Sequence, residues 1–193
     1  MTDIFDYLNW RGDLPMQAVP MNEVDGMVFA RIAYLPFEAF DVLHGETTVK
    51  DAAASLLAAD DPDGRIRQKN DAPLLRALRE SDRFGNAQIV DFESRTDTVS
   101  QTQFAAVTLR LPDDSICIAF RGTDNTLVGW KEDFNMSFVC PVAGQVLAVA
   151  YLERAAKQYP DCPITVLGHS KGGNFAVYAA AFCAPTTQAR IRA

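Results

Sequence analysis

The sequence is poor in the residues that bind metal ions. Only two histidines occur in 193 residues, and the four cysteines lie about twenty residues apart, with no Cys-x-x-Cys pair. Zinc and iron–sulfur sites need such residues at close spacing, so the pattern argues against both. Free thiols are the simplest interpretation, because Cys117 falls in an apolar strand pattern and Cys183 in an apolar helix pattern. We expect no metal and no other cofactor.

Positive charge and long apolar runs are also scarce. The net charge is −7 and the pI is near 4.8, which disfavours nucleic acids and anionic membrane surfaces as partners. No run approaches the ~18 apolar residues that a membrane span needs. The acidic amino terminus lacks the basic start and apolar stretch of a signal peptide. These absences favour a cytoplasmic protein without a membrane span, and they leave the oligomeric state open.

What the sequence does contain is the pattern of one α/β domain over residues 1–193. Residues 1–83 have helical periodicity, and residues 84–193 alternate strands and helices around a sheet core. The charged residues of the 72–83 helix are expected to form a solvated face. The expected helices are 22–34, 48–59, 72–83 and 143–158, and the expected strands are 87–94, 102–111, 115–120 and 163–167.

The most informative segment is Gly168-His-Ser-Lys-Gly172. An apolar, β-branched strand precedes it, and a helix pattern without glycine or proline covers residues 174–183 after it, so Ser170 falls at a sharp strand-to-helix turn. Glycines two positions on either side remove Cβ atoms that would collide in such a turn. We interpret Ser170 as a nucleophile at the amino end of a helix. The alternative is an ordinary turn of an α/β domain that happens to hold a serine.

A second motif, Phe120-Arg-Gly-Thr-Asp124, follows the 115–120 strand. A crossover connection would bring Thr123 and Ser170 to the carboxyl ends of neighbouring parallel strands. Acyl transfer needs hydrogen-bond donors aimed at the oxyanion. We expect one from the backbone N–H of Lys171 and another from Thr123, which can offer its N–H and its hydroxyl. Alternatively, Thr123 only caps the next helix.

Aromatic and apolar residues are frequent between the two motifs. We consider two interpretations: a lid or acyl-binding wall, and ordinary core packing, which the sequence slightly favours. The residues concerned are Trp130, Phe134, Met136 and Phe138.

The two motifs, with Trp130 and Asp133, resemble the pattern of the fungal-type (class three) lipases. The sequence is more similar to a bacterial group of lipase-like α/β-hydrolases, which carry Tyr7-Leu-Asn-Trp-Arg-Gly-Asp13 and Asn22-Glu-Val-Asp25 in similar form. The resemblance implies an α/β-hydrolase fold with a mostly parallel sheet flanked by helices. It also implies an esterase or lipase-like activity on an acyl ester or lipid, with Ser170 as nucleophile and Thr123 in the oxyanion hole.

The sequence departs from that pattern after the nucleophile. A serine needs a base and an orienting acid, which in α/β-hydrolases follow the serine, yet residues 171–193 contain no Asp, Glu or His. His169 should point away from Ser170, His44 would require an unusual chain order, and Lys171 is adjacent to the serine in the first turn of a helix. We therefore expect the acid and histidine beyond residue 193, with the chain carboxyl-terminally incomplete. The competing hypothesis is a non-catalytic, hydrolase-shaped binding or interaction module.

Overall fold

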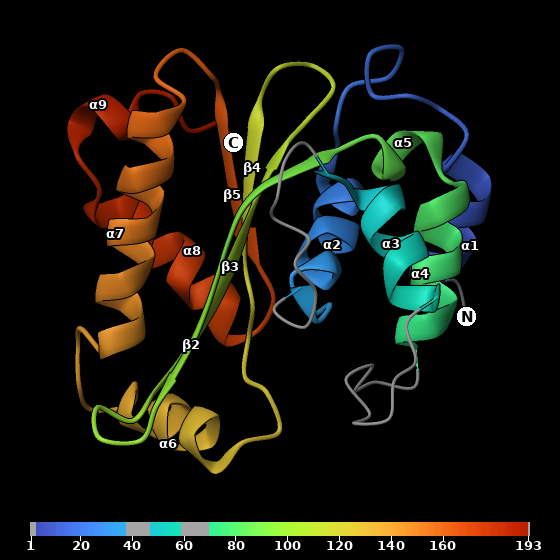
Figure 1. Cartoon of the computed structure of the whole chain (residues 1–193). Helices are drawn as coiled ribbons and strands as arrows, with labels where there is room; N and C mark the ends of the chain where they lie inside the picture. The colour runs from blue at the N-terminus through green and yellow to red at the C-terminus, as the bar shows by residue number, and fades with distance from the viewer. Residues whose placement is uncertain (1–2, 38–46, 59–69, 193) are drawn as a thin grey trace.

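The protein is an α/β structure in which helices pack on both sides of one sheet (Figure 1). The computed structural model describes residues 3–37, 47–58 and 70–192. The helices of this part of the chain are α1 (Ile4–Arg11), α2 (Glu23–Ile32), α3 (Val49–Ala58), α4 (Asp71–Glu80), α5 (Asp82–Gly85), α6 (Leu127–Asn135), α7 (Ala143–Gln158), α8 (Lys171–Phe182) and α9 (Pro185–Gln188). The helices expected at 22–34 and 143–158 are therefore confirmed as α2 and α7.

The sheet is mixed, with its strands in chain order from one edge to the other. Its strands are β1 (Thr47–Thr48), β2 (Gln88–Asp97), β3 (Thr102–Arg110), β4 (Ile116–Phe120) and β5 (Ile164–Gly168). The β1–β2, β2–β3 and β3–β4 pairs are antiparallel, and only β4–β5 is parallel. The expectation of a mostly parallel sheet is thus wrong for the described residues. Short turns join β2 to β3 and β3 to β4, and such turns reverse the chain, whereas the helix α7 lets β5 run parallel to β4.

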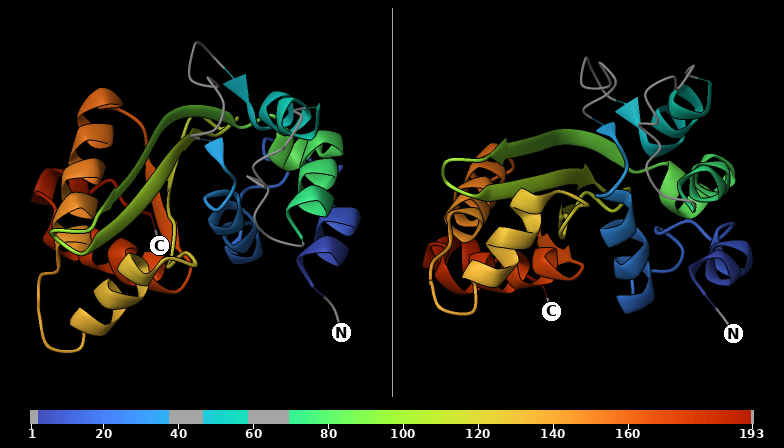
Figure 2. Two further views of the ribbon diagram at one scale, coloured as in Figure 1. Left: turned by 60° about the horizontal axis from the view of Figure 1, so that its bottom comes forward. Right: turned by 90° about the horizontal axis from the view of Figure 1, so that it is seen from below.

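Side chains of the central strands alternate between two apolar clusters, one on each face of the sheet. In β3, Phe104 and Ala106 face the cluster formed with α7 and α8, while Val107 and Leu109 face the cluster formed with α2 to α5. This alternation is the period of two expected of a strand. The amino-terminal and carboxyl-terminal helices remain on opposite sides of the molecule in both views of Figure 2. The β4–β5 pair therefore lies between two packed layers.

The amino-terminal helices depart from the expected pattern around residue 81. Helix α4 ends at Glu80, and Ser81 caps the separate short helix α5. Arg83, expected on a solvated face, is fully buried and forms an ion pair with the buried Asp25. It also donates to the carbonyls of Leu14, Val19 and Pro20. Buried charges need such partners, so the pair fixes the segment between α1 and α2.

The two amino-terminal motifs join the same network. The Tyr7 hydroxyl donates to Asp25 at 3.0 Å and accepts from the Asn22 side-chain amide at 3.0 Å. Asn22 also caps α2 through the N–H groups of Val24 and Asp25. These residues hold α2 in place, and α2 in turn contacts β4 and β5. The motifs thus have a structural explanation that requires no direct role in chemistry.

Candidate active site

Ser170 occupies the turn between β5 and α8 in an unusual backbone conformation. Its φ is 56° and its ψ is −127°, and its side chain is exposed. A positive φ is uncommon for a residue other than glycine and costs roughly 1–3 kcal/mol. The surrounding structure must therefore hold this residue in place.

Two glycines permit the tight turn at Ser170. A Cβ on Gly168 would lie 2.3 Å from the carbonyl oxygen of Gly172, and one on Gly172 would lie 2.1 Å from that of Phe120. Both distances are too short for any real contact. The first turn of α8 can therefore pack against the ends of β5 and β4 only because Gly168 and Gly172 have no Cβ. The turn at Ser170 thus depends on close backbone contacts among the end of β4, the end of β5 and the first turn of α8.

The segment after β4 lies directly beside the serine. Phe120 pairs with Gly168 in the parallel register, so both strands end at the same edge. A Cβ on Gly122 would lie 3.2 Å from Ser170 Cβ and 2.5 Å from the carbonyl oxygen of His169. The structure therefore brings the Phe120–Asp124 motif and the Gly168–Gly172 motif together.

Thr123 and Asp133 connect this segment to α6. The Thr123 hydroxyl donates its hydrogen to Asp133. Asp124 accepts from the N–H and hydroxyl of Thr126, which caps α6. The Thr123 hydroxyl is therefore already committed as a donor, contrary to the expectation that it could face the oxyanion. Its backbone N–H has no acceptor within the described part of the chain.

Lys171 has separate surroundings for its backbone and its side chain. As the first residue of α8, its N–H has no partner within the helix. The N–H groups of Gly172 and Gly173 already bond to the carbonyls of His169 and Ser170. The ammonium group of Lys171 is buried and donates to Glu132 at 2.8 Å and to the carbonyl and side-chain oxygens of Gln103 at 2.9 Å each. All three of its protons are bound, so the Lys171 amine is not a base for Ser170.

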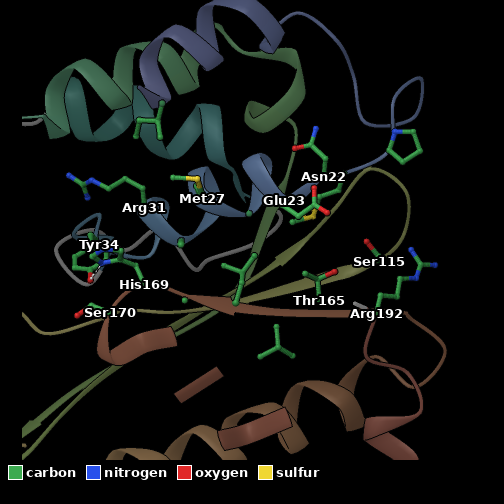
Figure 3. A pocket seen from close by; sticks show the side chains of 18 of the residues that line it. Asn22, Glu23, Met27, Arg31, Tyr34, Ser115, Thr165, His169, Ser170 and Arg192 are labelled. Carbon is green, nitrogen blue, oxygen red and sulfur yellow. Dashed lines mark hydrogen bonds between the residues drawn. The ribbon is translucent and has the colours of Figure 1, made fainter. Parts of the chain in front are cut away.

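Tyr34, just after α2, reaches both strand ends. Its hydroxyl accepts from the Gly122 N–H at 3.1 Å and lies 3.0 Å from His169 Nδ1. Burial raises the pKa of the phenol, which keeps it neutral at physiological pH. Figure 3 shows Tyr34, His169 and Ser170 gathered at one end of a cavity. The His169 ring is thus bonded to Tyr34, and no hydrogen bond joins it to Ser170 among the described residues; His44 lies outside them.

The cavity has a volume of about 970 Å³ and runs between α2 and β5. Met27 and Arg31 border it from α2, and Thr165 to Gly168 border it from β5. At the far end from Ser170, residues 190–192 pair with Ile164 in a parallel bridge. The lining is apolar in the middle and polar at both ends (Figure 3).

The aromatic residues in α6 and in the segment directly after it are not core residues. Trp130, Phe134 and Phe138 are each more than 60% exposed, which contradicts the interpretation as ordinary core packing. Only Met136 packs partly against the core. With Leu127, which is also exposed, Trp130 and Phe134 lie on one side of the helix at spacings of three and four residues. Helix α6 therefore presents an apolar stripe to solvent.

Three residues of this region were missed by sequence reasoning. Tyr34 looked like the end of a helix, Gln103 like part of a strand and Glu132 like part of a polar stretch. The one available signal was a polar residue, Gln103, directly before the apolar run 104–107 of its strand. Their contacts join residues 29 to 135 positions apart in the chain, so no local pattern contains them.

The fold and this site define an α/β protein that presents a serine at a strand-to-helix turn. A family model described as Mbeg1-like matches residues 78–193, which is more than half of the chain. The chain therefore belongs to the Mbeg1-like family, which is lipase-like and similar to the fungal-type lipases. Neither a curated protein nor a solved structure matches the sequence. None of the helices formed by the described residues is long and apolar enough to cross a membrane.

Proposed function

We propose that this protein is a serine hydrolase that cleaves acyl esters, with Ser170 as the nucleophile. The observation that carries the proposal is the backbone of Ser170, whose positive φ projects an exposed hydroxyl at the amino end of α8. A strained residue at a helix amino terminus suits attack on a carbonyl, because the helix end favours developing negative charge. Membership of a lipase-like family supports the same reaction class.

In this mechanism, Ser170 Oγ forms a bond to the ester carbonyl carbon while a base takes its proton. The negative charge on the carbonyl oxygen is stabilised by the N–H groups of Lys171 and Thr123. Collapse of this intermediate breaks the ester C–O bond and releases the alcohol, which takes back the proton. Water then hydrolyses the acyl-serine to a carboxylic acid and restores Ser170. We place the histidine base and its acid outside the described residues, because His169 is bonded to Tyr34.

The structural unit for this activity is one α/β-hydrolase domain over residues 1–193. The helical region 1–83 and the sheet core 84–193 belong together in this proposal because α2 contacts both β4 and β5. The exposed apolar stripe of α6 supports an acyl ester or a lipid as substrate. A hydrogen bond from the Thr123 hydroxyl to Asp133 joins the helix that carries the stripe to the proposed oxyanion segment.

One observation favours a second candidate, a non-catalytic module that binds an acylated ligand. No histidine or acid is hydrogen-bonded to Ser170 in the described part of the chain. Hydrolysis of p-nitrophenyl acetate and butyrate by the full-length protein separates the two functions. The proposed hydrolase loses turnover in Ser170→Ala and keeps it in Ser55→Ala, which alters an exposed serine on α3. A folded wild-type protein with no Ser170-dependent hydrolysis of either ester supports the binding module instead.

A further inference from the structure

Beside the proposed oxyanion site lies a buried ion pair that the reaction itself does not use. Lys171 is fully buried and Glu132 is 2% exposed, and their charged groups are 2.8 Å apart. The two residues come from different helices, α8 and α6. The pair therefore fixes the residue after the nucleophile relative to the helix that follows the Phe120–Asp124 motif.

Glu132 extends the connection to two further elements. One carboxylate oxygen accepts from the Gln103 N–H at 3.0 Å, and the other accepts from the Gly144 N–H at 3.0 Å. Gln103 belongs to β3 and Gly144 to the first turn of α7. Both oxygens are thus used, and the carboxylate holds β3, α7 and α8 at one point.

The Gln103 side chain links the two proposed donor segments. Its Oε1 accepts from Lys171 Nζ at 2.9 Å and from the Asp124 N–H at 3.3 Å. Lys171 follows Ser170 in the chain, and Asp124 follows Thr123. One amide oxygen of Gln103 therefore contacts both segments that carry the proposed oxyanion donors. A shift of this side chain would move the Thr123 and Lys171 N–H groups relative to each other.

Such a cluster is a poor way to gain stability alone. Removing two charges from water costs about as much as their attraction returns, and well-packed apolar residues can often replace a buried pair without loss. What the charged groups provide here is geometry, because charge-assisted hydrogen bonds are short and directional and so fix the positions of the groups that they join. The cluster contacts Lys171 and Asp124, which carry or adjoin the two proposed oxyanion donors. The N–H groups of Thr123 and Lys171 are therefore the groups that the cluster would position.

We propose that Lys171, Glu132 and Gln103 are positioning residues that hold the Thr123 and Lys171 N–H groups at the separation required to bind an oxyanion. This inference rests on the proposed function for its catalytic consequence. The cluster acts on the transition state, in which the charge develops, and has little effect on binding of the neutral ester. Its removal should therefore lower kcat and leave KM nearly unchanged.

The test replaces the ion pair by apolar residues of similar volume, Lys171→Met with Glu132→Leu, in the full-length protein. A matched control, Thr108→Val with Tyr151→Phe, removes a buried 3.0 Å hydrogen bond between β3 and α7 that involves none of the three cluster residues. The first double variant should melt below the control, because Glu132→Leu also leaves the Gln103 and Gly144 N–H groups without their acceptor, but it should still unfold in one cooperative transition. Its kcat for p-nitrophenyl butyrate should fall about tenfold or more, with KM changed less than about twofold.

A second variant and a second readout guard against failure of folding. Gln103→Met removes the shared amide oxygen without removing a charge, and it should lower kcat in the same direction. Hydrogen exchange should rise in peptides covering 121–126 and 168–174 in both variants and stay at the wild-type level in the control. Unchanged kcat and exchange in the folded variants would overturn the positioning role. If the wild type shows no Ser170-dependent turnover, the proposed function fails, while the exchange data still decide whether the cluster positions these segments.

Discussion

Replacing Gly172 with alanine should force the amino end of α8 away from the end of β4. The added Cβ would lie 2.1 Å from the Phe120 carbonyl oxygen and 2.7 Å from its carbon. Ordinary contacts between such atoms are above about 3 Å, so the backbones must separate by roughly 1 Å. Both neighbours are main-chain atoms, and no side-chain rotation can relieve the overlap.

The cost follows from the kind of atoms that collide. Overpacking of a well-packed interior costs about 1–3 kcal/mol, and a clash with backbone belongs at the upper end of that range. For a protein of this size, about 3 kcal/mol lowers the melting temperature by roughly 6–12 °C. A displacement of roughly 1 Å at the nucleophile should also lower turnover about a hundredfold.

Gly26→Ala is the matched control for this substitution. A Cβ on Gly26, inside α2, would meet Leu167 at 3.6 Å and Met21 at 3.9 Å, which are ordinary contacts. Alanine in a helix interior should stabilise the protein by about 0.5–1 kcal/mol. Urea unfolding followed by circular dichroism measures both variants. The reasoning is refuted if Gly172→Ala unfolds within about 0.5 kcal/mol of the wild type, or if the control loses as much stability.

Three further predictions concern the site and its surroundings. Thr123→Val keeps the backbone N–H but removes the hydroxyl bonded to Asp133, so ester turnover should fall only about tenfold, less than the loss of a donor; a fall above a thousandfold would assign the hydroxyl a direct role. Tyr34→Phe leaves the Gly122 N–H without its acceptor, so urea unfolding should show a loss of about 1–3 kcal/mol, and an unchanged stability would contradict the bridge. Burial raises the pKa of Tyr34 and Tyr151 above the ordinary 10.0. The folded state therefore keeps protons that the unfolded state loses, so the contribution of these two tyrosines to stability should be constant below about pH 9 and fall as the pH rises past about 10. Tyr151→Phe should flatten that decline in unfolding free energy, and an identical pH profile would exclude Tyr151 as a cause.

The local parts of this structure could be predicted from the sequence. Apolar periodicity gave α2, α7 and the strands β2 to β5 to within a few residues, because these elements bury one face or both. The spacing of Gly168 and Gly172 around Ser170 indicated a tight turn, because only glycine fits there. These predictions needed only the neighbours of each residue along the chain.

The parts that depend on distant contacts could not be predicted. The resemblance to hydrolases wrongly favoured a mostly parallel sheet, whereas in the described part of the chain only the β4–β5 pair is parallel. Arg83 was expected on a solvated face because its partner Asp25 is 58 residues away, and the ion pair of Lys171 was not foreseen because Glu132 is 39 residues away. Burial of a charge depends on such a partner, and a single sequence does not identify it.

Covalent labelling with a fluorophosphonate tests the central claim most directly. The full-length protein is treated with the probe, and the adduct is measured by intact mass and located by peptide mapping. We predict one adduct per chain, on Ser170, which is absent in Ser170→Ala and retained in Ser55→Ala. A folded wild-type protein that carries no adduct, or one that carries it on another residue, would contradict Ser170 as the nucleophile.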